Sequence, residues 1–357
     1  MSTIKVQNIQ HTASSTNAIA LASDGTATAN LTNRQGKNLI INGAMQVAQR
    51  GTSATNSGYG TVDRFRVQHS GTDEAPTQEQ VDVASGTTPY TLGFRKALRI
   101  TNGNQTSGAG TSDSTHFQYY AESQDIANSG WNYLSSSSFV TLSFWIKSSV
   151  AQNFQGRVRT RDGTSQNYAF ETGSLSADTW TKITKTIPGN SNLQFDNDTA
   201  KNFQIDIFAF LGTDDTSSAV SLDTWATYTS GTQVKDVTST WYTTNNATLE
   251  ITGVQLEVGS VATDFEHRSL AQELSLCERY YAKYVNLSTG YGSGNGYARS
   301  THLFRNRMRA APSRTITNTN VGSLNSSSAN EDSVMVTWQS LSGTSTGEFT
   351  LELDSEL

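Results

Sequence analysis

The sequence has a single cysteine and no run of basic residues, and each absence excludes a class of protein. Cys277 alone cannot form an intrachain disulfide or a cysteine-rich zinc site. No segment approaches the ~18 apolar residues of a membrane-spanning helix, and the first residues lack the apolar core of a signal peptide. We therefore expect synthesis in the cytoplasm, no secretion and no membrane insertion. Because the net charge is −6, we also expect no nucleic-acid partner.

Helix-forming runs and catalytic motifs are scarce as well. Charged residues make up only 16% of the chain, and Ser, Thr, Asn, Gln and Gly dominate the remainder. Strand-forming Thr, Tyr, Phe, Trp and Val alternate with turn-forming Gly, Asn and Asp. This pattern predicts an all-β protein of short strands, in a sandwich or a barrel.

Changes in composition and hydrophobic pattern divide the chain into four predicted parts. Residues 1–36 carry two short strands around Asp24-Gly25, and such an isolated hairpin needs identical chains or a docking protein to be stable. Residues 37–268 form the predicted sandwich, with 139–147 and 203–210 as its central strands. Its predicted strands lie at 38–43, 58–67, 97–101, 115–122, 139–147, 153–161, 167–171, 179–187, 202–211 and 248–258.

A short connector helix and a small β-domain complete the predicted chain. Residues 269–281 form the connector, where Ser269 and Gln272 have the spacing of a capping box. Residues 282–357 form a C-terminal β-knob with strands near 297–305, 314–319, 333–340 and 347–353. A domain of ~75 residues is marginal on its own core, so we expect it to associate with copies of itself.

Aromatic residues outside the apolar runs are the candidate sugar-binding groups, because sugars stack on aromatic rings beside a few polar groups. Trp225 with Tyr228, and Trp241 with Tyr242, lie in a Ser/Thr/Gly-rich segment between the last two sandwich strands. They would bind a glycan, cover the edge of the sandwich or meet a neighbouring subunit. A glycine-rich loop of the knob adds a second candidate recognition surface, formed by Tyr291, Asn295 and Tyr297.

Other conspicuous side chains are given structural roles. Trp145 and Trp180 are predicted to lie in the core. Three arginines on alternate positions would share one face of a strand, where they meet an anionic glycan or, as we prefer, pair with acids across a subunit seam. The arginines are Arg305, Arg307 and Arg309, and the acids are Glu331, Asp332, Glu352 and Asp354.

The sequence predicts no catalysis and no cofactor. A glycosidase needs two carboxyl groups held across a sugar. The candidate acids are interpreted instead as solvated strand and turn residues, namely Asp214, Asp215, Glu250 and Glu257. The five histidines have no zinc-site spacing, and neither a nucleophile elbow nor a phosphate-binding loop occurs.

Seven segments, in order along the chain, resemble a domain common in phage tail-fibre-like proteins. They are 38–51 (NLIINGAMQVAQRG), 59–65, 142–147 (LSFWIK), 177–189, 252–269, 273–281 and 308–312 (MRAAP). The resemblance implies a jelly-roll sandwich similar to carbohydrate-binding modules. Residues 1–36 resemble the attachment segments of marine phage fibre proteins.

The resemblance implies a homotrimer on the virion, as a tail or surface fibre. Residues 1–36 would hold another virion protein, and the chain would attach the phage to a host surface glycan. The alternatives are a head fibre or tail decoration with a purely structural role, and a glycan depolymerase. Jelly-roll binding modules often hold a structural calcium, for which Asp63 and Asp264 would be ligands here.

Overall fold

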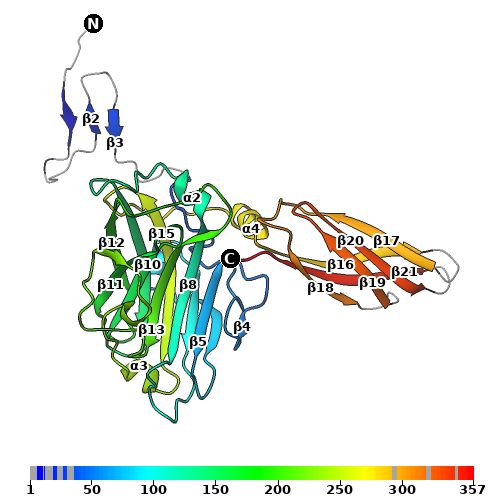
Figure 1. Ribbon diagram of the computed structural model, residues 1–357, viewed down its shortest axis with the longest axis horizontal. Helices are drawn as coiled ribbons and strands as arrows, with labels where there is room; N and C mark the ends of the chain where they lie inside the picture. The colour runs from blue at the N-terminus through cyan, green and yellow to red at the C-terminus, as the bar shows by residue number, and fades with distance from the viewer. Residues whose placement is uncertain are drawn as a thin grey trace, which may run out of the picture.

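The structure, a computed structural model, describes residues 6–10, 12, 19–21, 27–29, 36–291, 296–318, 323–341 and 345–357. Figure 1 shows a large sandwich with an elongated knob projecting from its side and a small sheet at the N-terminus. That small sheet has three strands, β1 (Asn8–Ile9), β2 (Ile19–Leu21) and β3 (Ala27–Ala29). The Asp24-Gly25 turn predicted between β2 and β3 lies outside the described residues.

Two six-stranded antiparallel sheets make up the sandwich and confirm the predicted jelly roll. Sheet 1 has the order β14-β11-β10-β13-β8-β5. Its strands are β5 (Phe65–Ser70), β8 (Ser114–Glu122), β10 (Asn153–Arg159), β11 (Gln166–Ser174), β13 (Lys201–Leu211) and β14 (Trp225–Thr227). Sheet 2 has the order β12-β9-β15-β7-β6-β4. Its strands are β4 (Ser53–Ala54), β6 (Thr77–Asp82), β7 (Lys96–Thr101), β9 (Phe139–Ser148), β12 (Thr181–Pro188) and β15 (Thr248–Val258).

Strict alternation along the central strands builds the core between the sheets. On β9 every second residue is fully buried in the core, beginning with Val140 and ending with Ile146. On β13 the inward positions are Phe203, Ile205 and Ile207. Because each such side chain contributes about 1.5–3 kcal/mol when buried, these two strands are a major source of stability. Polar and aromatic residues at the intervening positions face outward.

Residues 38–43 do not form the predicted strand. They form an irregular segment that ends in a turn, and Leu39 N donates to the Leu256 carbonyl at 2.9 Å. The Asn38 side chain also bonds the backbone of β15, which is free here because pairing between β15 and β9 is interrupted between Thr252 and Gln255. Gly43 is required at this point, since a Cβ atom would collide with the Val254 carbonyl. The apolar run is therefore an irregular segment that packs against β15 where the pairing of that strand is interrupted.

Short helices punctuate the sandwich, and one longer helix follows it. The short ones are α1 (Thr88–Thr91), α2 (Ser123–Ala127), the 3-10 turn η1 (Ser230–Thr232) and α3 (Thr240–Thr243). The connector helix α4 spans Leu270–Glu278, and its capping box between Ser269 and Gln272 confirms the sequence prediction. No helix in the described ranges is long and apolar enough to cross a membrane.

The knob consists of two three-stranded antiparallel sheets. One has the order β16-β21-β18, with β16 (Tyr281–Tyr291), β18 (Ser313–Asn318) and β21 (Ser345–Asp354). The other has the order β17-β20-β19, with β17 (Gly296–Leu303), β19 (Ser323–Ala329) and β20 (Ser333–Leu341). Between them lies a small core that includes Trp338, Phe349 and Leu351.

Charged side chains join the knob to the sandwich. Arg64 is fully buried, stacks on Tyr280 with its guanidinium carbon 3.4 Å from the ring centroid, and pairs with Glu356. Arg279 binds both carboxylate oxygens of Glu122 at 2.9 Å. The C-terminal residues return to the sandwich, where Tyr59 donates its hydroxyl to the final carbonyl. The knob is thus held on both sides of its base.

The three arginines predicted to share a strand face lie after β17 and belong to no strand. Arg305 pairs with Glu278 at 3.0 Å, and Arg307 approaches Glu331 at 3.6 Å. Arg309 donates to backbone carbonyls, including that of Thr199 in the sandwich. All three therefore bind groups of their own chain and support the knob and its junction.

Candidate functional site

A cavity of about 470 Å³ opens over the outer face of sheet 2, and we call it the aromatic pocket. Its floor includes Ser143 and Trp145 from β9, and one wall is Lys182 from β12. The other walls come from the segment after α1 and the segment after β15. The lining residues of these two segments are Thr91, Leu92, Gly93, Phe94, Thr263, Asp264, Phe265 and His267.

Aromatic contacts hold the two wall segments together. Phe94 meets Phe265 edge to face, with ring centroids 4.9 Å apart, and His267 packs against both rings. A ring nitrogen of His267 lies 2.8 Å from the Leu92 carbonyl oxygen. Gly93 has φ +99°, and a Cβ there would lie 3.0 Å from the His267 ring, so glycine suits both the turn and the contact.

The pocket has the chemistry expected of a sugar site. Trp145 and Phe265 are half-buried, and their rings offer apolar surface within a polar frame. Lys182, Asp264 and His267 are exposed at its margin, where they would bond hydroxyl groups. Ligand sites of about 300–1,000 Å³ with aromatic walls and a few polar groups are typical of small-molecule and saccharide recognition.

Sequence reasoning missed this site because it assigned Trp145 and Trp180 to the core. Both rings are half-buried and pack beside the small cluster formed by Ala44, Val83 and Phe94 on the outer side of sheet 2. The sequence of β9 contains a pattern that places Trp145 on the outer face of the sheet. Since the even-numbered positions 140–146 fill the core, Trp145 shares its face with Ser143 and Lys147.

Trp241 and Tyr242, predicted as glycan-binding, are core residues. Both are fully buried, and Tyr242 stacks on Phe210 with ring centroids 4.4 Å apart. Their polar atoms are used internally, by Thr248 and Asp113 respectively. The prediction is corrected for this pair because α3 turns both rings between the sheets, where no glycan can reach them.

The remaining predicted residues do not converge on one site. Trp225 is half-buried at the edge of sheet 1 and donates to the Pro188 carbonyl at 2.7 Å. Tyr228 lies under Arg159, whose guanidinium carbon is 3.4 Å from the ring centroid. Tyr297 is 71% exposed on β17 of the knob. Asn295 and the side chain of Tyr291 lie outside the described residues.

The predicted acidic groups are held by neighbouring protein atoms. Glu250 pairs with Lys147 at 2.9 Å, and Glu257 accepts from the backbone and hydroxyl of Thr263. Asp63 is buried, which raises its pKa to about 6, and accepts two bonds from Gln49. Asp264 borders the aromatic pocket instead. In the parts of the chain that the structure describes, no group of three or more His, Cys, Asp or Glu side chains is placed to hold a metal.

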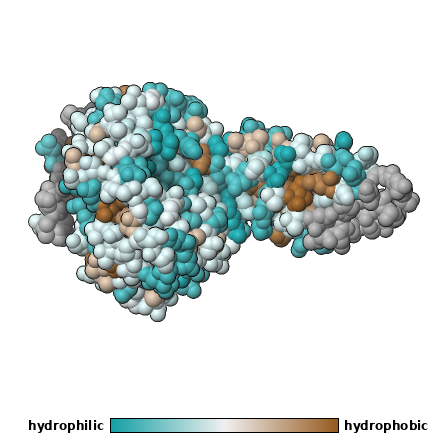
Figure 2. All heavy atoms as spheres, turned by 60° about the horizontal axis from the view of Figure 1, so that its bottom comes forward, coloured by the Kyte–Doolittle hydropathy of each residue, from teal (hydrophilic) through white to brown (hydrophobic). Residues whose placement is uncertain are grey.

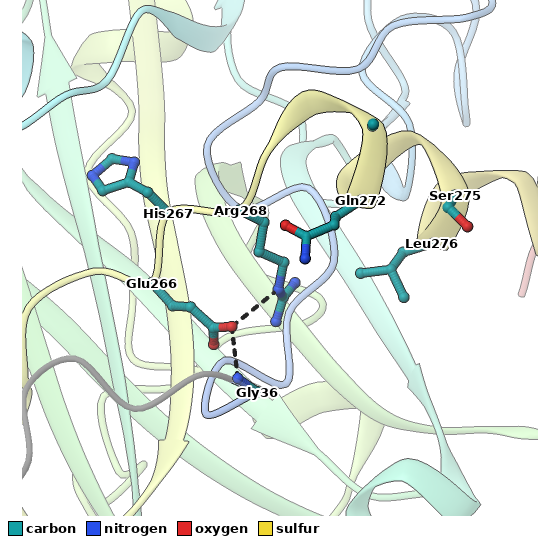
Figure 3. Close-up of a pocket in the computed structure, with 8 residues that line it drawn as sticks. Gly36, Glu266, His267, Arg268, Gln272, Ser275 and Leu276 are labelled. Carbon is teal, nitrogen blue, oxygen red and sulfur yellow. Dashed lines mark hydrogen bonds and ion pairs between the residues drawn. The ribbon is translucent and has the colours of Figure 1, made fainter.

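A second cavity of about 570 Å³ lies beside α4 (Figure 3). Glu266 accepts there from the backbone N–H groups of Gly36 and Asn38 and pairs with Arg268 at 3.4 Å. These bonds lower the pKa of Glu266, although burial acts against them. The Gln272 side chain is committed to the helix cap. Glu266 is thus bonded within the chain, and it fixes the start of the sandwich to the segment that follows its last strand.

Comparisons with known proteins give only distant similarities. No protein-family model and no curated protein sequence matches the chain. The fold is similar to a solved structure described as "CBM4 structure and function", with 14% identity, 61% of this chain and 98% of that chain covered, and a TM-score of 0.32. It is also similar to a putative sugar binding protein from Bacteroides thetaiotaomicron VPI-5482, with 13% identity, coverage of 62% and 100%, and a TM-score of 0.35.

A third similar structure is the enzymatically active domain of tailspike protein 4 from bacteriophage CBA120. The identity is 10%, the TM-score is 0.32, and the match covers 62% of this chain and 21% of that chain.

Proposed function

We propose that this protein is a subunit of a phage tail fibre or surface fibre that attaches the virion to a host surface glycan without cleaving it. The aromatic pocket is the observation that carries this proposal, because it combines the rings of Trp145 and Phe265 with the exposed polar groups of Lys182, Asp264 and His267. The ordered sequence resemblance to phage tail-fibre-like proteins supports the virion context.

The proposed assembly is a homotrimer attached to another virion protein through residues 1–36. Several copies would bind one glycan surface together, so weak binding at each pocket would be strengthened by multivalency. The knob, which projects from the sandwich (Figure 1), would be displayed with it. A purely structural fibre is the rival role, and it requires no glycan affinity.

A glycan array probed with the purified full-length chain tests the proposal, followed by titration of the best saccharide. Trp145→Ala removes the floor ring and is expected to weaken binding about tenfold, equivalent to ~1.4 kcal/mol. Trp180→Ala is the matched control, since this half-buried tryptophan lies on the same side of sheet 2 but does not line the pocket. Thermal unfolding of both variants verifies that each remains folded.

Three outcomes would contradict parts of the proposal. Absence of binding to every glycan by the assembled protein would favour the purely structural role. Equal loss in the two tryptophan variants would remove the assignment of the pocket. New reducing ends after incubation with host polysaccharide would identify the protein as a depolymerase.

A further inference from the structure

Sheet 1 carries an unusual set of basic side chains on its outer face, across the sandwich from the aromatic pocket. Phe65 and Val67 of β5 point into the core, so Arg66 between them points outward. In the same way Val158 directs Arg157 and Arg159 of β10 to the outside. We define the cationic face as these three arginines with Arg161 and Lys201.

Two tyrosine rings organise the cationic face. The ring of Tyr120 on β8 has three cations near its centroid, with Lys201 at 5.3 Å, Arg161 at 5.5 Å and Arg66 at 5.8 Å. Arg159 lies over the second ring, that of Tyr228. Contacts to ring faces within ~6 Å stabilise cations, so the rings hold these side chains in place without neutralising them.

On this face, among the described residues, Asp206 is the carboxylate that forms an ion pair with an arginine. Asp206 accepts from Arg157 Nε at 2.6 Å, and from Gln118 and Gln204 at 2.8 and 2.7 Å. In the described part of the chain no carboxylate lies within 4.0 Å of the charged nitrogens of Arg66, Arg159, Arg161 or Lys201. Four cations thus gather here in a chain of net charge −6.

Burial and the neighbouring positive charges act in the same direction on the pKa of two of these cations. Burial, followed by the charges of Arg161 and Arg157, lowers the pKa of Arg159. Burial, followed by Arg161 and Arg66, lowers the pKa of Lys201. An anion bound among them would relieve this repulsion, because it would supply the missing countercharge.

Unpartnered polar atoms on the same face are an independent observation. Five buried atoms that make no hydrogen bond belong to outward positions of sheet 1. They are Arg66 Nε, His116 Nδ1, Gln118 Oε1, Gln155 Oε1 and Asn167 Oδ1. Buried polar groups are normally bonded, so these five atoms mark the outer face of sheet 1 as a place where polar bonds remain to be made.

We propose that the cationic face binds the acidic sugars of a host surface polysaccharide, through their carboxylate or phosphate groups. Arginine suits this role because its planar fork bonds both oxygens of such a group. A nucleic acid fits less well, since the Tyr120 ring is surrounded by cations and nearly buried, which leaves it no face for base stacking. The inference rests on the proposed glycan-binding function and adds the charge of the glycan.

Polygalacturonate oligosaccharides and neutral dextran oligosaccharides, titrated into the full chain by calorimetry, test this proposal. We expect measurable binding of the acidic probe only at low salt, with affinity falling as salt rises. The double variant Arg66→Gln/Arg161→Gln should weaken that binding at least tenfold. Arg299→Gln/Arg307→Gln in the knob is the control with the same change of charge, and it should leave binding unchanged. A phosphorylated oligosaccharide of equal length separates phosphate from carboxylate as the preferred group.

Several results would overturn the inference. One is binding of dextran as tight as that of polygalacturonate. Another is equal loss of acidic binding in both double variants, and a third is tighter binding of a single-stranded oligonucleotide of the same charge. If Trp145→Ala abolishes glycan binding while the Arg66/Arg161 variant retains all of it, the proposed function stands and the cationic face does not. If the acidic probe binds through the arginines and Trp145→Ala has no effect, the inference stands and the aromatic pocket falls.

Discussion

The large sandwich and the knob are both two-sheet β-structures, but they are stabilised in different ways. The large core includes bulky side chains from every long strand of both sheets. Among its described residues the knob has a core of eight buried side chains, and it exposes Val285 and Leu303. Figure 2 shows hydrophobic residues on its surface. A core of that size is marginal on its own. We infer that the charged junction supplies stability that the knob core lacks.

Truncating one core ring in each part should show the difference between the sandwich and the knob most clearly. Phe144→Ala and Trp338→Ala each remove a fully buried ring, at an expected cost of about 3–5 kcal/mol in free energy of unfolding. Phe144→Ala should lower the main calorimetric transition. Trp338→Ala should unfold the knob alone and leave the sandwich transition in place. Equal lowering of the sandwich transition by both variants would show that the two parts unfold as one unit.

The junction gives the next largest effect. Arg64→Met leaves Glu356 buried with weaker compensation, since Arg50 lies 3.5 Å from it, and should cost about 3 kcal/mol. Adding Glu356→Gln should recover part of that loss in urea unfolding. Arg307→Met is the control, because the exposed Arg307–Glu331 pair should contribute at most ~1 kcal/mol. A similar cost for Arg64→Met and Arg307→Met would contradict the role given to the junction.

Two buried groups should give pH effects of opposite sign. Asp63, beside the junction, has its pKa raised from 3.8 to about 6 by burial, so its contribution to stability is present below pH 3.8 and lost as pH rises through about 6. His116, on the cationic face, has its pKa lowered from 6.5 to about 4, chiefly by burial. Its contribution is therefore present above pH 6.5 and lost as pH falls through about 4. Each amounts to roughly 3 kcal/mol.

Urea unfolding of Asp63→Asn and His116→Gln between pH 4 and 7 measures both effects. Relative to the original protein, Asp63→Asn should gain stability as pH rises and His116→Gln should gain it as pH falls. Parallel curves for the two variants would show that neither group titrates as its burial requires.

Periodicity in the sequence predicted the parts of the fold that depend on local pattern. The central strand predicted at 139–147 and the capping box at Ser269 both appear in the structure as expected. The strand β19 was missed because its sequence, SLNSSSA, is polar and almost wholly exposed, so no apolar alternation marks it. Residues 38–43 were misassigned for the opposite reason, since a short apolar run is equally typical of a strand and of a buried irregular segment.

The candidate sites were harder to predict, because each is assembled from segments distant in sequence. The ring centroids of Phe94 and Phe265 lie 4.9 Å apart although the residues are 171 positions apart in sequence, and no local pattern predicts that contact. The arginines of β10 are separated from Arg66 by 91 and 93 positions, and their shared face depends on strand order. Trp241 and Tyr242 show the converse, since a polar neighbourhood in sequence surrounds two rings that are fully buried.

The way the knob is attached also determines how it would carry a mechanical load. The chain leaves the sandwich at Tyr281 and returns at Asp354, and these two residues are paired across β16 and β21. A pull on the distal end of the knob is therefore shared by two hydrogen-bonded strands, each fastened at its base by buried ion pairs or cation–π contacts. Such a double attachment resists twisting as well as extension, so tension on the knob would turn the whole sandwich instead of stretching a flexible tether.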